Sequence, residues 1–258
     1  MTAAPAPRRD RRERRRPSAF WIMAPVVVPF VGYFAKIRIE GAENLPETGP
    51  FVLAPNHYTK IDPLIVAVAV WRLGRAPRFM LKDSLLRVPV VGPVLRWAGM
   101  IPVGRGGGPT RASAGSLSTV DALTSTGAGV IVYPEGTLTR DPELWPMRGK
   151  TGAARLALAG GMPLVPMAHW GSEQFLPRYG RFKLWPPRRP VRLVFGPPMD
   201  VPPADPDHPH VSAVELTDRL MGEITDLVAG LRDETPPQTR WNPTEHGQSE
   251  TGRLESEG

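Results

Sequence analysis

Short apolar runs alternate along the chain with longer segments of mixed polarity. Runs of four to six mostly apolar residues predict β-strands at residues 51–54, 78–82, 129–133, 163–168 and 191–195, and a short strand is also predicted at residues 36–40. The segments between them predict helices at about residues 63–72, 85–98, 110–126 and 151–159, followed by a last helix from residue 212. This alternation predicts an α/β fold in which a largely parallel central sheet is flanked by helices.

Proline, glycine and capping residues indicate where several helices break or end. Pro89 and Pro93 interrupt the helix at 85–98, because proline lacks a backbone donor and clashes with the preceding turn. Gly127 can close the next helix as a C-cap. A capping box of Ser212 and Glu215 predicts the start of the last helix. Its apolar stripe steps by three or four residues: Leu216, Leu220, Ile224, Leu227 and Leu231.

The amino-terminal residues combine a basic arm with an apolar run. Residues 1–16 are predicted to be a disordered basic arm, because seven arginines and two acids at residues 8–16 give it a net charge of +5. Residues 20–35 contain no charge, but spanning a bilayer takes about 20 apolar residues, and two prolines would kink a helix here. Together, the arm and the apolar run predict a membrane-interfacial segment at residues 17–35, held at an anionic surface.

Three other interpretations of this region stay open. A basic stretch followed by an apolar one is also the pattern of a secretory signal, although no A-x-A-like cleavage site closes the run. Residues 20–35 could also form a plain buried helix. The arm alone could bind nucleic acid, but no recognised nucleic-acid motif accompanies its arginines.

Charge and composition divide the chain further and exclude some classes of protein. Residues 233–258 carry a net charge of −4 and are predicted to be a disordered acidic tail, which leaves +6 on residues 17–232. The folded domain is predicted at residues 36–232. The chain has no cysteine, which excludes a disulfide scaffold, a cysteine nucleophile and a thiolate metal site. Its five histidines show no metal-ligand spacing, so no zinc site is expected.

A first candidate site follows the predicted strand at residues 51–54. His57 lies in the loop after this strand, and Asp62 precedes Pro63 at the start of the next helix. Strand ends and helix N-termini are where open α/β sheets bind ligands. A histidine there can take a proton from an attacking hydroxyl, best when a carboxylate holds its other ring nitrogen. Alternatively, Asp62 only caps its helix and His57 is an ordinary loop residue.

A second candidate is Arg105, which enters a loop rich in glycine. Its guanidinium can bond a phosphate in bidentate fashion, and the glycines allow close approach. A flexible surface loop is the alternative. The sequence contains no G-x-S-x-G motif, so if His57 is a base, the nucleophile must come from the substrate.

A third candidate follows the predicted strand at 129–133. Glu135 and Gly136 form a turn that can bind a polyol or stabilise its own loop, with Thr137 and Arg140 beside it. Lys150 lies close to a predicted helix start, where it can bind an anion, but the spacing of a Walker A motif fails.

Several stretches occur in one order along residues 36–200. They are Glu40-Gly-Ala-Glu-Asn-Leu-Pro-Glu-Thr-Gly-Pro50, Asn56-His57 with Asp62-Pro63, Gly99-x-Ile-Pro-Val-x-Arg105, Pro134-Glu-Gly-Thr137 and Val165-Pro166. Together they resemble the glycerolipid acyltransferases typified by 1-acyl-glycerol-3-phosphate acyltransferase. The chain departs from that pattern at Leu138 and Thr139, where Arg-Ser would complete the third motif.

The resemblance implies acyl transfer from a thioester of coenzyme A or acyl carrier protein to a lysophospholipid hydroxyl. His57 would be the general base and Asp62 would orient it. Arg105 would bind the acceptor phosphate, and Glu135, Gly136 and Thr137 would shape the acceptor pocket. Arg140 would compensate for the missing arginine of the third motif, and Lys150 resembles a basic position that often follows it.

The resemblance also sets the expected partners and location. Membrane lipids, the lysophospholipid acceptor and the acyl thioester are the expected partners, with no nucleic acid and no metal or cofactor. Acyl thioesters are cytosolic, so we expect peripheral or monotopic attachment at the cytoplasmic face of the cell membrane. Another polar lipid acceptor, or a catalytically silent membrane-binding relative, stays open as an alternative.

Overall fold

A computed structural model of the chain describes residues 19–89, 91–103, 117–183, 185–203 and 209–249. The helices are α1 (Ala19–Phe34), α2 (Asp62–Arg72), α3 (Asp83–Leu86), α4 (Val91–Trp97), α5 (Leu117–Thr126), α6 (Gly152–Gly160) and α7 (Pro209–Arg232). The strands are β1 (Ala35–Glu40), β2 (Phe51–Pro55), β3 (Met80–Lys82), β4 (Ile101–Val103), β5 (Gly129–Ile131), β6 (Leu164–Trp170) and β7 (Arg189–Phe195).

Five of the strands form one sheet in the order β1-β7-β6-β2-β5. The pairs β1–β7, β2–β6 and β2–β5 are parallel, and only β6–β7 is antiparallel. β3 and β4 form a separate parallel pair, which a bridge between Phe79 and Ile131 joins to the main sheet. The predicted α/β fold with a largely parallel sheet is therefore confirmed.

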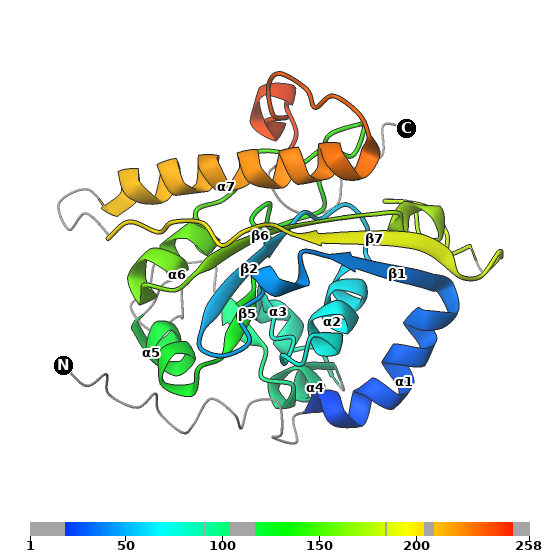
Figure 1. Cartoon of the computed structure of the whole chain (residues 1–258), viewed down its shortest axis with the longest axis horizontal. Helices are drawn as coiled ribbons and strands as arrows, with labels where there is room; N and C mark the ends of the chain where they lie inside the picture. The colour runs from blue at the N-terminus through cyan, green and yellow to red at the C-terminus, as the bar shows by residue number, and fades with distance from the viewer. Residues whose placement is uncertain (1–18, 90, 104–116, 184, 204–208, 250–258) are drawn as a thin grey trace.

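Helices cover both faces of this sheet (Figure 1). Because successive strand residues point to opposite faces, β2 contributes to two cores. Phe51 and Leu53 pack with α1 and α2 on one face, and Val52 and Ala54 pack with α6 and α7 on the other. β2 is buried along its whole length. The strand that leads to His57 is therefore fixed from both sides.

Most predicted boundaries agree with the structure. Pro89 lies between α3 and α4, as predicted, but Pro93 is the third residue of α4 and does not interrupt it, because a proline in the first turn removes no intrahelical hydrogen bond. Gly127 ends α5 with φ 66°, and the amide of Ala128 donates to the carbonyl of Leu123 over 3.0 Å. Residues 110–116 of the predicted helix lie outside the described residues. The predicted start of the last helix is wrong: α7 begins at Pro209, three residues before Ser212. Proline suits the first helical turn, where its missing donor is not needed.

The apolar run forms a helix, α1, that continues through Pro25 and Pro29. One side of α1 is buried, and the ring of Phe20 lies 5.6 Å from that of Trp71 in α2. Large apolar side chains are exposed on the rest of the helix: Trp21, Ile22, Val26, Phe30 and Tyr33. In the described part of the chain, no helix has the length and apolarity needed to cross a membrane. The basic arm lies outside the described residues, and interfacial binding stays a prediction.

The prediction of a disordered tail is wrong for residues 233–249. The amide of Arg148 donates to the carbonyl of Trp241 over 2.9 Å, and the indole of Trp241 stacks on His246 at 3.5 Å. A short 3-10 helix follows at Pro243–His246. The net charge of the tail indicated disorder, but these residues contact the folded domain through the carbonyl of Trp241 and through an ion pair of Arg240 with Asp218 in α7. Residues 250–258 lie outside the described part.

Candidate active site

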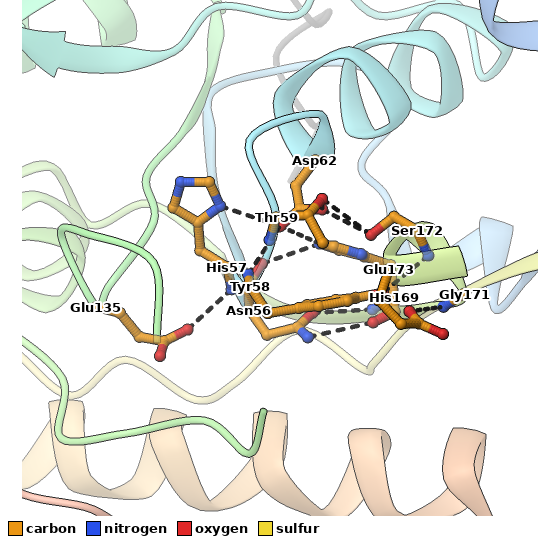
Figure 2. A network of polar contacts seen from close by, with 10 residues as sticks. All are labelled: Asn56, His57, Tyr58, Thr59, Asp62, Glu135, His169, Gly171, Ser172 and Glu173. Carbon is orange, nitrogen blue, oxygen red and sulfur yellow. Dashed lines mark hydrogen bonds and ion pairs between the residues drawn. The ribbon is translucent and has the colours of Figure 1, made fainter. Parts of the chain in front are cut away.

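The site is built around a histidine and an aspartate that lie five residues apart. His57 follows the end of β2, and Asp62 is the first residue of α2, so the intervening loop turns the two side chains together. Nδ1 of His57 lies 3.1 Å from Oδ2 of Asp62 (Figure 2). A carboxylate only accepts, so Nδ1 carries the proton and Nε2 keeps its lone pair. The side chain of His57 retains 16% exposure. Nε2 is therefore the ring nitrogen with a lone pair, on a side chain that is partly exposed.

Asp62 is fully buried and bonded on both oxygens. Oδ2 accepts from the amides of Tyr58 and Thr59 over 2.8 and 2.7 Å, and Oδ1 accepts from the hydroxyls of Thr59 and Ser172. Burial alone would raise the pKa of Asp62. Electrostatic attraction from His169, whose Nε2 lies 3.8 Å from Oδ2, and the hydrogen bond and electrostatic attraction from His57 outweigh burial and lower this pKa to about 2. Asp62 is therefore ionised at neutral pH.

These bonds exclude the simpler interpretation of Asp62 as a helix cap. The N-cap of α2 is Ile61, and no side chain caps this helix. The Asp62 carboxylate points back to the loop that carries His57, with hydrogen bonds to Tyr58 and Thr59. The residue therefore organises the loop and the imidazole instead of ending the helix.

A second histidine fixes the peptide immediately before His57. The side-chain amide of Asn56 pairs with the backbone of His169, over 2.9 and 3.2 Å, and Nε2 of His169 lies 3.0 Å from the carbonyl of Asn56. Since a carbonyl only accepts, Nε2 is the donor. Burial lowers the pKa of His169, which favours its neutral form. Sequence analysis missed His169 and Ser172, because they follow the apolar core stretch at residues 165–168 without any recognisable spacing.

The loop after β5 holds the backbone of His57 on both sides. Oε1 of Glu135 accepts from the amide of His57 over 2.8 Å, and the amide of Thr139 donates to the carbonyl of His57 over 2.7 Å. Oε2 of Glu135 accepts from the amide of Met147 over 3.1 Å. Burial raises the pKa of Glu135 to about 8. Glu135 is fully buried and approaches His57 from a different side than Asp62 (Figure 2). In this structure it positions His57.

An aromatic ring lies flat against the imidazole. The rings of Tyr133 and His57 stack at 4.1 Å with an angle of 25°, and Phe79 stacks on Tyr133 at 6.1 Å. The hydroxyl of Tyr133 is buried and has no hydrogen-bond partner among the described residues. The stack restricts rotation of the imidazole.

The structure gives fewer contacts for the other predicted site residues. Gly136 adopts φ 69°, and a Cβ added there would lie 3.1 Å from Cδ of Lys150, so the lysine side chain runs over this turn. Arg140 is buried and Thr137 is partly buried. Arg105 lies outside the described residues. The structure brings His57, Asp62 and Glu135 together, whereas acceptor binding by the other residues stays a prediction.

Three comparisons relate the chain to known proteins. The sequence model of the family described as "Acyltransferase" matches residues 36–170. The chain is 32% identical over 145 residues to "1-acyl-sn-glycerol-3-phosphate acyltransferase BAT2, chloroplastic" from Brassica napus, covering 56% of this chain and 40% of that protein. It is 31% identical over 151 residues to the "1-acyl-sn-glycerol-3-phosphate acyltransferase" of Bacillus subtilis, covering 57% of this chain and 70% of that protein.

A solved structure supports the fold. The crystal structure of "the 1-acyl-sn-glycerophosphate (LPA) acyltransferase, PlsC, from Thermotoga maritima" matches with a TM-score of 0.54, 21% identity and 80% coverage of both chains. The chain spans only about 40% of the length of the chloroplastic relatives. The family match, at residues 36–170, covers more than half of the 258 residues and includes His57, Asp62 and Glu135. The chain therefore belongs to the acyltransferase family.

Proposed function

We propose that this protein is a membrane-associated enzyme that moves a fatty acyl group from an acyl thioester to the free hydroxyl of a lysophospholipid. The proposed acceptor is 1-acyl-glycerol-3-phosphate, and the product is phosphatidate. The observation that carries the proposal is the 3.1 Å contact between Nδ1 of His57 and the ionised Asp62, which leaves Nε2 free to act as a base. The names of the Brassica napus and Bacillus subtilis relatives support this acceptor.

The chemistry follows from the two ring nitrogens. Nε2 of His57 accepts the proton of the acceptor hydroxyl while its oxygen attacks the thioester carbonyl carbon. Asp62 stabilises the imidazolium that forms. The tetrahedral intermediate then expels the thiolate, which accepts this proton from Nε2. The products are an ester and a free thiol, and no electrons are exchanged. General-base catalysis of this kind contributes about 10²–10⁴-fold to the rate.

Membrane association is supported by the amino-terminal residues. α1 exposes Trp21, Ile22 and Val26, and the sequence before it carries the basic arm. Apolar side chains and basic residues together bind anionic membrane surfaces more strongly than either alone. A long-chain lysophospholipid stays in the bilayer, so an enzyme at its surface meets the acceptor there. The thioester would arrive from the cytoplasmic side, as acyl-coenzyme A or acyl carrier protein.

The departure from the third motif makes the acceptor the first property to test. The hydroxyl of Thr139 donates to the carbonyl of Trp145 over 2.6 Å, so this side chain is used within its own loop. Purified full-length protein should be given acyl-coenzyme A or acyl carrier protein thioester with a panel of acceptors, and the products measured by mass spectrometry. We expect lysophosphatidate to react fastest. Faster transfer to another polar lipid would overturn the acceptor, and no transfer to any would favour the silent membrane-binding relative.

A further inference from the structure

The exposed apolar side chains of this protein are concentrated in two places. Of the fifteen large apolar side chains that are exposed in the described chain, ten lie at residues 21–33 and 85–97. The first segment is α1. The second is the α3–α4 hairpin, which we define as residues 83–89 and 91–97. Its five exposed apolar residues are Leu85, Val88, Val91, Val94 and Trp97. Such concentration marks a surface that contacts another apolar phase.

The contacts that hold the α3–α4 hairpin together explain why these side chains point outward. Leu86 is the buried apolar residue of α3, and α4 packs against its backbone: a Cβ added at Gly92 would lie only 2.0 Å from the Leu86 carbonyl oxygen. The guanidinium of Arg96 donates to the same carbonyl. Backbone contact and one arginine therefore join the helices. In a soluble domain, the apolar side of such a hairpin would turn inward.

The charged residues around the α3–α4 hairpin indicate the kind of surface that it contacts. Residues 82–97 contain three basic residues, Lys82, Arg87 and Arg96, and a single acid, Asp83, which forms an exposed ion pair with Arg87. Trp97 is 55% exposed beside Arg96. Tryptophan, aliphatic residues and arginine together suit the headgroup region of an anionic bilayer. A second copy of this chain fits less well, because a symmetric contact would place the same basic residues against one another.

The α3–α4 hairpin is also connected to the active site. Phe79 immediately precedes β3, the strand that leads into α3. Its ring stacks on Tyr133, which stacks on the imidazole of His57. Two aromatic rings therefore separate the base from the segment that carries the hairpin.

We propose that the α3–α4 hairpin is a second membrane-contact surface, separate from α1, which inserts Val94, Trp97 and their exposed neighbours into the headgroup region of an anionic leaflet. Contact at both α1 and the hairpin would hold the chain in one orientation and keep His57 near the leaflet that contains the acceptor. This inference rests on the proposed membrane function but does not require turnover to be measured.

The absence of native cysteine allows a direct test. Val94 in the hairpin and Val214 in α7, on the opposite face of the sheet, are both 40% exposed and form a matched pair (Figure 1). Val94→Cys and Val214→Cys should be labelled with an environment-sensitive fluorophore and mixed with vesicles of phosphatidylcholine and phosphatidylglycerol. We expect a blue shift at position 94 and none at position 214.

Three results would overturn the inference. One is an unchanged dye at position 94 although the protein sediments with the vesicles. Another is an equal shift at position 214. The third is a shift at position 94 without vesicles that grows with protein concentration, which would identify a second copy as the occupant.

Activity separates this inference from the proposed function. Val94→Glu should weaken sedimentation with the vesicles about tenfold or more, whereas Val214→Glu should not. Val94→Glu should also slow transfer to lysophosphatidate in vesicles and leave transfer to a short-chain, water-soluble acceptor unchanged. If Val94→Glu shows normal turnover on vesicles, the proposed membrane contact of the hairpin is refuted and the proposed enzymatic function is not. If position 94 inserts into vesicles but the unsubstituted protein shows no turnover, the proposed enzymatic function is refuted and the hairpin surface is not.

Discussion

The amide of His57 donates to Oε1 of Glu135 over 2.8 Å, although 78 residues separate them in the sequence. The proposed base is therefore held in two ways: its ring by Asp62 and its backbone by the loop after β5. The two contacts do different work. Asp62 selects the protonated ring nitrogen, whereas Glu135 fixes where the ring is placed.

Glu135→Gln tests the backbone contact. Both oxygens of Glu135 accept from amides, of His57 and Met147, and the hydroxyl oxygen of a protonated carboxyl can still accept. The NH2 group of glutamine cannot accept, so one buried donor loses its partner. An unsatisfied buried donor costs about 1–3 kcal/mol. We expect chemical denaturation to show a loss of this size and kcat to fall with it. Full stability and full activity in Glu135→Gln would contradict the positioning role.

The same carboxyl makes stability depend on pH. Burial raises the pKa of Glu135 from 4.5 to about 8. Between these values, the folded chain binds a proton that the unfolded chain has released, so the free energy of unfolding falls as the pH rises. Burial also lowers the pKa of His169 from 6.5. Below pH 6.5 this histidine has the opposite effect, because there the unfolded chain binds more protons than the folded chain, so the free energy of unfolding rises as the pH rises. The free energy of unfolding of the unsubstituted protein and of Glu135→Gln should therefore be measured by denaturation at several pH values. We expect it to fall less steeply towards pH 8 in Glu135→Gln. Identical pH profiles would contradict the raised pKa.

Asp62→Asn tests the tautomer. The asparagine amide can donate to Nδ1 of His57, which would place the ring proton on Nε2 and remove the base. We expect kcat to fall by about 10²–10⁴-fold while KM for the acceptor stays within a few fold. Steady-state kinetics with lysophosphatidate measure both constants. A variant whose KM rises while kcat is kept would place Asp62 in acceptor binding instead.

Tyr133 offers a test of the ring stack. Tyr133→Leu removes the ring that restricts rotation of the imidazole, an interaction worth about 0.5–1 kcal/mol, so we expect kcat to fall about two- to fivefold. Tyr133→Phe keeps the ring and removes a buried hydroxyl without a partner among the described residues, so activity should be kept and stability should not fall. Equal losses in both variants would show that the hydroxyl matters and the stack does not.

Local contacts in this fold were predictable from the sequence, and several distant ones were not. The strands and most helix ends follow from apolar runs, prolines and Gly127. The antiparallel pairing of β6 with β7 does not, because neither strand's own pattern sets the direction of its partner. Net charge also misled at residues 233–249, where Trp241 packs on His246 despite the acidic composition.

In the candidate site, too, the local contact was predictable from the sequence and the distant contacts were not. His57 and Asp62 meet within one loop and one helix start, so their spacing was informative. Ser172 reaches Asp62 across 110 residues, and only the fold brings them together. Sequence analysis identified Glu135 and left open whether it binds a polyol or stabilises its own loop, while the family resemblance implied a part in the acceptor pocket. The structure shows its oxygens on backbone amides, a role that leaves no motif because any residue can supply an amide.

The most direct measurement is the rate of acyl transfer by His57→Ala. Purified full-length variant and unsubstituted protein should receive the same labelled thioester and lysophosphatidate, with circular dichroism and thermal unfolding as controls for the fold. Because Nε2 of His57 is the proposed proton acceptor, we predict a loss in kcat of about 10²–10⁴-fold with the fold unchanged. Transfer at the unsubstituted rate by a folded His57→Ala variant would contradict the assignment of His57 as the base.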